Sequence, residues 1–121
     1  MTLQERLEAL ARGVEGAVGA ALLGEDGVPL CQWMAVGAGV EVEAGWVECL
    51  PLVALARQVG GAEGGLEGLT VQAARCWTLV SVVDDRHHLV LSLAPGGNAG
   101  KGRYLLRLHA PEFRREVAAL G

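Results

Sequence analysis

Residues 46–59 read WVECLPLVALARQV, and the only polar side chains in this stretch belong to Glu48, Arg57 and Gln58. A helix that lies on a small soluble domain needs one apolar stripe and keeps its other face polar. At helical spacing this stretch offers two apolar stripes, which consist of Cys49, Leu52, Ala56 and Val59, and of Trp46, Leu50 and Val53. One stripe can cover the domain's own sheet. The other needs a separate cover, and a second copy of the chain is the simplest candidate.

The chain has 121 residues, enough for one hydrophobic core, so we expect a single domain over residues 1–121. The net charge is −4, and no basic stripe is present that would neutralise the phosphates of a nucleic acid. No apolar run reaches the roughly 18 residues of a membrane span, and Gln4, Glu5 and Arg6 make the start too polar for a signal peptide. The absence of isoleucine and the excess of arginine over lysine are typical of a GC-rich bacterial genome. We therefore expect a cytoplasmic bacterial protein.

The first third of the chain predicts a helix followed by a β-hairpin. Thr2 and Glu5 form a capping box, and Leu3, Leu7, Leu10 and Val14 then recur on one helical face. Two apolar runs, residues 17–23 and 28–34, flank the turn signal Asp26-Gly27. The first run is apolar on both faces, which favours a central strand, and Pro29 favours an edge position for the second.

The last half of the chain predicts an antiparallel meander and a closing helix. Alternation begins near Leu66 and marks a third strand from Leu69 to Ala74, followed by strands at 77–83 and 88–94. Asn98 is placed to cap the last helix, whose predicted inner face consists of Tyr104, Leu105, Leu108, Phe113, Val117 and Leu120. Pro111 should kink this helix or split it in two. For the middle helix, Pro51 leaves two starts open, one near Trp46 and one at Pro51 itself.

The element order is therefore α-β-β-α-β-β-β-α. This order predicts an α+β fold, in which a five-stranded antiparallel sheet carries the middle helix on one face and the two terminal helices on the other.

Residue types that often carry chemistry have structural explanations here, and we expect no catalytic residue, metal or cofactor. Adjacent strand residues point to opposite faces, so His87 and His88 fit a solvated turn better than a metal site. We expect His109 at a helix end.

The cysteines and serines also fit structural roles. The three cysteines, Cys31, Cys49 and Cys76, are far apart in the sequence and fit packed, reduced thiols. Ser81 and Ser92 lie within predicted strands rather than on a strained turn, which argues against a serine nucleophile. The stretch 96–102 lacks the ending of a phosphate loop and fits a helix cap.

Three residues of the middle helix could contact a partner. Trp46 could be a core residue or could project toward a partner protein, and the sequence leaves both possibilities open. Glu48 and Arg57 fit solvated positions, and an arginine-finger role for Arg57 is the less favoured alternative.

Two motifs resemble the roadblock-type dynein light-chain family. Residues 13–18, with the run from Ala20 to Gly27, look like the opening of that family's domain, and residues 98–104 are similar to its Asn-x-Gly start of the last helix. The element order extends the resemblance over essentially the whole chain. Pro111 and the glycine-rich stretch 60–68 depart from the common pattern.

The resemblance implies a non-enzymatic homodimer, or a dimer of relatives, whose third strands pair into one sheet and whose middle helices lie side by side. It also implies a small Ras-like GTPase as partner, as for the MglB-type regulators, with the paired helices as the platform. We expect the dimer interface to include Trp46, Leu50, Val53, Leu69 and Val71, and the partner-binding residues to include Trp46, Glu48 and Arg57. The third strand supports this expectation. Its residues 69–74 include no charged residue and no proline, which are the residues that usually prevent an edge strand from pairing with another chain.

Two other classes remain as alternatives. A small-molecule sensor of PAS or GAF type also uses a five-stranded antiparallel sheet, but it needs polar groups that converge on a pocket, and such groups are scarce on the predicted strands. An enzyme would need a carboxylate pair, an activated nucleophile or a metal cluster, none of which the sequence offers.

Overall fold

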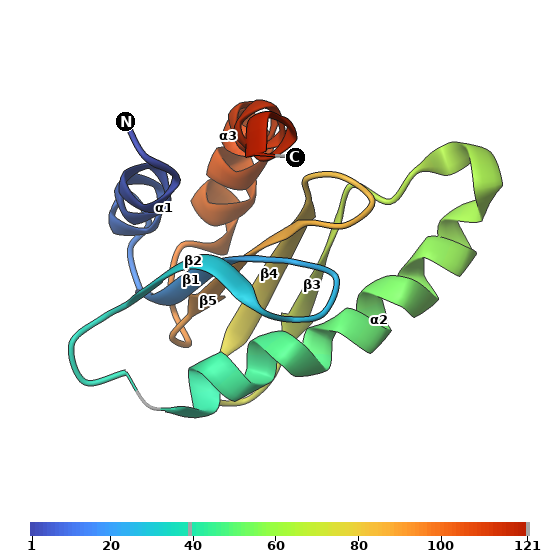
Figure 1. The fold of residues 1–121 in the computed structure, drawn as a ribbon. Coiled ribbons are helices and arrows are strands. Elements are labelled where there is room, and N and C mark those ends of the chain that lie inside the picture. Colours follow the sequence, from blue (N-terminus) through green and yellow to red (C-terminus); the bar gives the residue numbers. More distant parts are fainter. Residues whose placement is uncertain (39, 121) are drawn as a thin grey trace.

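The computed structural model describes residues 1–38 and 40–120 and has three helices around one antiparallel sheet (Figure 1). In chain order the elements are α1 Leu3–Arg12, β1 Ala17–Leu23, β2 Pro29–Met34, α2 Val40–Gly64, β3 Gly68–Gln72, β4 Trp77–Val82, β5 His88–Leu93 and α3 Ala99–Leu120. The strand order is β2-β1-β5-β4-β3, so β1 is inside the sheet and β2 and β3 are its edges. Helices α1 and α3 lie on one face and α2 on the other. The predicted fold class and both strand placements are confirmed.

The alternation of the strands divides the core into two unequal parts. On β1, Ala20 and Leu22 face α1 and α3, whereas Ala21 and Leu23 face α2. The part beneath α1 and α3 is the larger and includes Phe113, which is 1% exposed. The part beneath α2 has fewer buried residues and includes the side chain of Trp46. Helix α2 therefore rests on a smaller apolar base than the other two helices.

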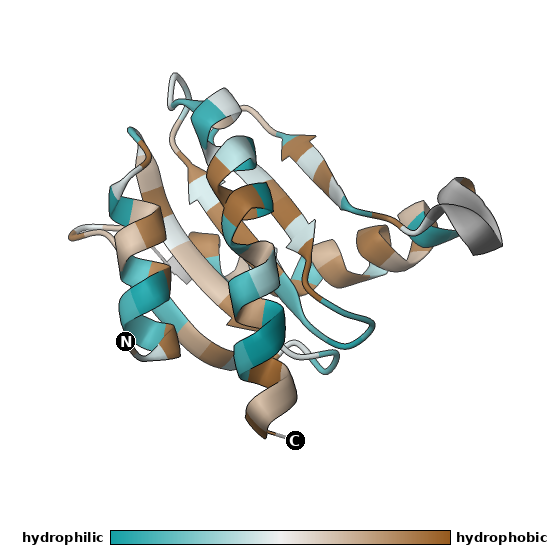
Figure 2. Ribbon diagram, turned by 90° about the horizontal axis from the view of Figure 1, so that it is seen from above, coloured by the Kyte–Doolittle hydropathy of each residue, from teal (hydrophilic) through white to brown (hydrophobic). Residues whose placement is uncertain are grey.

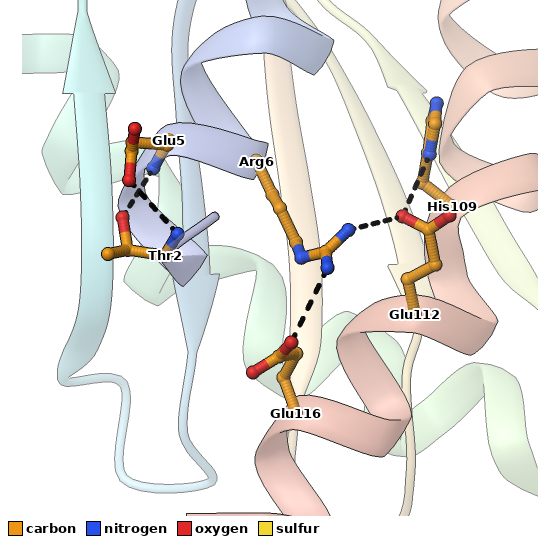
Figure 3. A network of polar contacts seen from close by, with 6 residues as sticks. All are labelled: Thr2, Glu5, Arg6, His109, Glu112 and Glu116. Atoms are coloured by element: carbon orange, nitrogen blue, oxygen red, sulfur yellow. Dashed lines mark hydrogen bonds and ion pairs between the residues drawn. The ribbon is translucent and has the colours of Figure 1, made fainter.

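The N-terminal helix is fixed at its start and along its side (Figure 3). The Thr2 hydroxyl oxygen accepts a hydrogen bond from the Glu5 amide, and the Glu5 carboxylate accepts one from the Thr2 amide, which confirms the capping box. Arg6 crosses to α3, where its guanidinium lies 2.8 Å from a Glu112 oxygen and 3.5 Å from a Glu116 oxygen. Both acidic residues of α3 thus face α1.

Helix α3 is one unbroken helix, so Pro111 does not split it. The ring of Pro111 is exposed, and the carbonyl that a proline leaves without an amide partner lies four residues earlier, near solvent. The predicted inner face was partly wrong, because Tyr104, Leu108 and Leu120 are 61%, 52% and 68% exposed. The buried positions include small residues that the pattern of large apolar residues misses, and they are Ala99, Gly102, Leu106, Ala110, Phe113 and Val117.

Helix α2 extends beyond the predicted residues 46–59 at both ends. Gly45 lies inside the helix, and the Gly60-Gly61 pair does not end it. A glycine within a helix costs only about 1 kcal/mol relative to alanine, so contacts elsewhere along the helix can offset it. Because the helix starts at Val40, Pro51 is an interior residue, and neither of the two predicted starts is correct. The third strand is also shorter than predicted and ends at Gln72.

The two motifs that carry the family resemblance meet in space. Gly16 has a φ of +85°, and a Cβ at this position would lie 2.6 Å from the Cα of Gly97. On either side of this contact, the Ala94 amide donates to the Gly16 carbonyl and the Asn98 amide donates to the Glu15 carbonyl. The loop that follows α1 therefore packs backbone to backbone against the turn that starts α3.

Replacing Gly16 with alanine tests this contact. Gly96 is the matched control, since its φ of +88° is similar but a Cβ there meets nothing within 4 Å. We expect Gly96→Ala to lower the free energy of unfolding by about 1–2 kcal/mol, the cost of a left-handed residue with a side chain. Gly16→Ala should cost at least about 1 kcal/mol more, because the two backbones must separate. Urea unfolding followed by circular dichroism measures both, and equal losses would contradict the contact.

Candidate interaction surface

The side of α2 that faces the sheet is fixed by Trp46. Its side chain is 1% exposed, and its indole Nε1 donates a hydrogen bond of 2.9 Å to the hydroxyl oxygen of Ser92 on β5. Cys49 and Val53, at 5% and 2% exposure, complete the same side. Of the two possibilities for Trp46, the structure selects the core residue. It also places the Val53 side chain in the core, so neither residue is on the free surface of the helix.

A second polar contact joins α2 to β5 eleven residues farther along the helix. The Arg57 Nη2 lies 3.2 Å from Nε2 of His88 and 3.5 Å from the Asp84 carbonyl oxygen. A guanidinium can only donate, so Nε2 of His88 is the acceptor and the imidazole is neutral. Burial lowers the pKa of His88, and the positive charge of Arg57 lowers it further. Arg57 was predicted to be a solvated residue of the helix, but its guanidinium also contacts His88 and the Asp84 carbonyl.

The two histidines of the β4–β5 region have different surroundings. His88 is 5% exposed, which corrects the prediction that both lie in a solvated turn. His87 stays partly exposed, with its Nδ1 2.8 Å from an Asp84 carboxylate oxygen. Burial acts to raise the pKa of Asp84, but hydrogen bonds from the Arg86 amide and from His87 outweigh it and hold this pKa below its usual value. His109 lies in the middle of α3, beside Glu112, and not at a helix end.

The other sides of α2 carry exposed apolar residues, and their grouping differs from the predicted stripes. Leu52, Leu55 and Val59 are 43%, 59% and 86% exposed, whereas Cys49, which was grouped with Leu52 and Val59, is buried. Leu50, grouped with two buried residues, is only partly buried. The sheet-facing side is therefore a single stripe at positions 46, 49 and 53, and the remaining apolar residues lie outside the buried core.

The flanks of α2 can be assigned from its neighbours. A Cβ on Gly27, in the β1–β2 turn, would lie 3.3 Å from a methyl carbon of Leu50 and 3.6 Å from one of Val47. Successive helical residues are about 100° apart, so Leu52, Ala56 and Val59 lie on the opposite flank, toward β3. Glu48 and Leu55, both exposed, point away from the sheet. The helix thus offers an apolar flank beside β3 and an outer surface that carries the Glu48 carboxylate.

Strand β3 continues this surface. It pairs only with β4, and its other edge is free among the described residues. Leu69 and Val71 are partly buried, and they face the α2 side because they pair with Val80 and Thr78. The predicted interface residues Leu50, Leu69 and Val71 are therefore accessible in part, and β3 lies next to the apolar flank of α2.

The remaining candidates are structural. Burial raises the pKa values of the Cys31 and Cys49 thiols, and the nearby Cys76 adds to the effect on Cys49. The Asn98 side chain accepts a hydrogen bond from the Lys101 amide, which confirms the helix cap in the stretch 96–102. Among the described residues, no three potential metal ligands lie together. No helix in the same part of the chain is long and apolar enough to cross a membrane.

The lowered pKa of His88 predicts a pH dependence of stability. Above the ordinary histidine pKa of about 6.5 both the folded and the unfolded chain are neutral at this residue. Below it the unfolded chain binds a proton that the folded chain resists, so stability is lost as the pH falls through the folded pKa. We expect the free energy of unfolding to fall between about pH 7.5 and pH 5.5, with a smaller slope in His88→Gln.

Two further variants make this measurement specific. Arg57→Gln should also reduce the slope, because it removes the charge that lowers the His88 pKa. The control is His109→Gln, which removes a histidine about one third exposed beside Glu112 and should leave most of the slope intact. Urea titrations at a series of pH values give the slopes, and an unchanged slope in both His88→Gln and Arg57→Gln would contradict the assignment.

Comparisons with known proteins agree on the fold. No family model matches the sequence, and no curated protein matches it either. Among solved structures, the chain is 31% identical to MglC from Myxococcus xanthus, with a TM-score of 0.70 over 96% of this chain and 99% of MglC. A roadblock/LC7 domain from Streptomyces avermitilis is 17% identical, with a TM-score of 0.80 over 98% of this chain and 99% of that domain. The gliding protein MglB from Thermus thermophilus is 22% identical, with a TM-score of 0.75 over 93% of this chain and 85% of MglB.

The likenesses to the Streptomyces domain and to MglB show a shared fold. The likeness to MglC is one of sequence as well, and it extends over nearly the full length of both chains. With the roadblock architecture and the two motifs that meet where the Asn98 amide donates to the Glu15 carbonyl, the chain belongs to the roadblock/LC7 family.

Proposed function

We propose that this protein is a non-enzymatic homodimeric module that binds a small Ras-like GTPase and regulates or scaffolds it. The observation that carries the proposal is the exposed apolar surface of α2 beside the free edge of β3, both among the described residues. The similarity to MglC and MglB supports it, and one solved MglB structure has a tetrameric arrangement. The dimer and the GTPase would use different parts of this surface.

The dimer would form at the flank of α2 that lies toward β3. Pairing of β3 with its copy satisfies the free backbone groups of that edge and brings the two α2 helices side by side. Leu52, Ala56 and Val59 would then face the second helix, with Val71 beneath them. A stable interface buries about 1,200–2,000 Å² in total, which a strand pair and a helix pair of these lengths can supply.

The mass of the protein in solution tests the dimer. We expect light scattering to give twice the chain mass of 12.6 kDa. The double variant Leu52→Glu/Val59→Glu should give a monomer, because two carboxylates would be desolvated at the helix pair. The matched control is Val28→Glu/Val36→Glu, which changes two exposed valines away from this flank and should leave the dimer intact. A wild-type monomer at high concentration would refute the proposed assembly.

The GTPase would bind the outer surface of α2, which points away from the sheet. Glu48 and Leu55 lie there, with Pro51 between them, and all three are exposed. In a dimer with adjacent α2 helices these residues form one platform, of an apolar centre with a carboxylate on each helix. Trp46 and Arg57 would act on the partner indirectly, because Trp46 is buried and Arg57 is held by His88.

Binding to the small Ras-like GTPases of the same genome tests this platform. We expect calorimetry to detect at least one of them, loaded with GDP or with a non-hydrolysable GTP analogue. Glu48→Lys and Leu55→Glu should each weaken binding by at least about tenfold, as expected for central interface residues. Glu25→Lys, an equal charge change in the β1–β2 turn, should stay within about twofold. If no such GTPase binds in either nucleotide state, the proposed partner is wrong even if the dimer forms.

The alternative of a PAS- or GAF-like sensor gains no support from the polar groups on the α2 face of the sheet. A sensor needs polar side chains that are free to meet a ligand. Here Ser92 accepts from Trp46, and Nε2 of His88 accepts from Arg57, so both side chains serve to hold α2. The other ring nitrogen of His88, Nδ1, is buried without a partner among the described residues.

A further inference from the structure

The face of the sheet opposite α2 has a groove that neither the dimer nor the GTPase platform uses. Figure 2 shows this face from above, with α1 and α3 over the sheet and β3 beside α3 without a helix over it. The groove runs between α3 and the strands β3 and β4 and has a volume of about 670 Å³. Its floor includes Thr70, Leu79 and Ser81, and α3 forms its wall.

The wall of the groove is basic. Arg103, Arg107 and Arg114 line it. None of the three guanidinium groups is within ion-pair distance of a carboxylate in the part of the chain that the structure describes. Arg114 uses its Nε to donate to the Val83 carbonyl oxygen at 2.7 Å, which leaves its two terminal nitrogens able to donate elsewhere. Among the lining residues, Glu67 alone is acidic.

The positive charge of this wall is opposite in sign to the net charge of the protein. The chain as a whole has a net charge of −4. Both acidic residues of α3, Glu112 and Glu116, point to the other side of the helix, where they hold Arg6 (Figure 3). The two carboxylates of α3 thus point toward α1, whereas Arg103, Arg107 and Arg114 lie toward β3. The fold itself does not require this separation, because the three arginines pair with no carboxylate of the described residues.

The groove is also partly apolar. Leu79, Leu106 and Ala110 are buried along it, and Pro111 is exposed at its side. From Arg103 to Arg114 the wall follows about eleven residues of helix, or about 16 Å. An extended peptide of about five residues has this length, and its side chains alternate between two sides. Such a segment can place acidic side chains on the arginines and apolar side chains on the floor.

We propose that this groove binds an acidic, partly apolar peptide segment of a partner protein. Charge complementarity favours this occupant, and bidentate pairing of arginine with carboxylate supplies the geometry. A nucleic acid fits less well, because three arginines beside a partly apolar lining on an acidic protein neutralise few phosphates. The inference goes beyond the proposed GTPase platform. It concerns the opposite face, and pairing of β3 through its edge leaves this face open.

Fluorescence anisotropy with a labelled peptide tests the groove in the intact protein. The probe is a short peptide in which acidic residues alternate with leucine. We expect Arg103→Glu/Arg107→Glu to weaken its binding by at least about tenfold. The matched control is Arg86→Glu/Arg115→Glu, the same charge change at two exposed arginines outside the groove, which should stay within about twofold. Circular dichroism checks that both variants are folded.

Three measurements decide the result. Amide chemical shifts on titration should change at Thr70, Leu79 and Ser81 and not on α2. A peptide with lysine in place of the acidic residues should not bind, and a single-stranded oligonucleotide should bind more weakly than the acidic peptide. Absence of binding by the wild-type protein, equal losses in the two double variants, or preference for the oligonucleotide would each overturn the proposal. None of these outcomes depends on whether the GTPase binds α2.

Discussion

The hydrogen bond from the Trp46 indole to Ser92 determines how α2 lies on the sheet. Hydrophobic burial has no direction, and a helix that is apolar on nearly every side could rest on the sheet in several rotations. The indole and the Ser92 hydroxyl would both be left without partners in a different rotation, and a buried polar group without a partner costs about 1–3 kcal/mol. The Arg57–His88 contact fixes the same rotation at the other end. These two contacts thereby decide which apolar residues stay outside.

The narrow core beneath α2 explains why polar contacts are needed there. On the face covered by α1 and α3, large side chains such as Phe113 form an extensive apolar contact between the helices and the sheet. Under α2 the sheet offers small residues such as Ala21 in the same layer as Ser92 and His88. Because α2 buries little apolar surface against the sheet, other apolar side chains of the helix stay exposed to solvent. The exposure of Leu55 and Val59 follows from this arrangement.

Much of the fold could be predicted because its signals are local. The capping box at Thr2, the Asp26-Gly27 turn and the alternation of the strands each depend on a few neighbouring residues, and all are found in the structure. The rotation of α2 could not be predicted, because Ser92 lies 46 residues away from Trp46 and only the folded sheet brings them together. The buried side of α3 was predicted only in part, at Phe113 and Val117, because the pattern of large residues does not reveal that Gly102 packs closely: a Cβ there would lie 2.7 Å from a methyl carbon of Leu79. His88 was missed because a strand position beside a turn does not reveal a buried partner.

The start of α1 and the end of α3, the first and last described elements, lie on the side of the sheet opposite α2 (Figure 1). Any polypeptide attached to either end therefore emerges on that side and has to pass around an edge of the sheet to reach α2. Tethering the protein by a terminus, to a larger assembly or to a support, would leave the apolar helix facing outward into the surroundings. Both points of attachment are thus on the face of the sheet opposite α2.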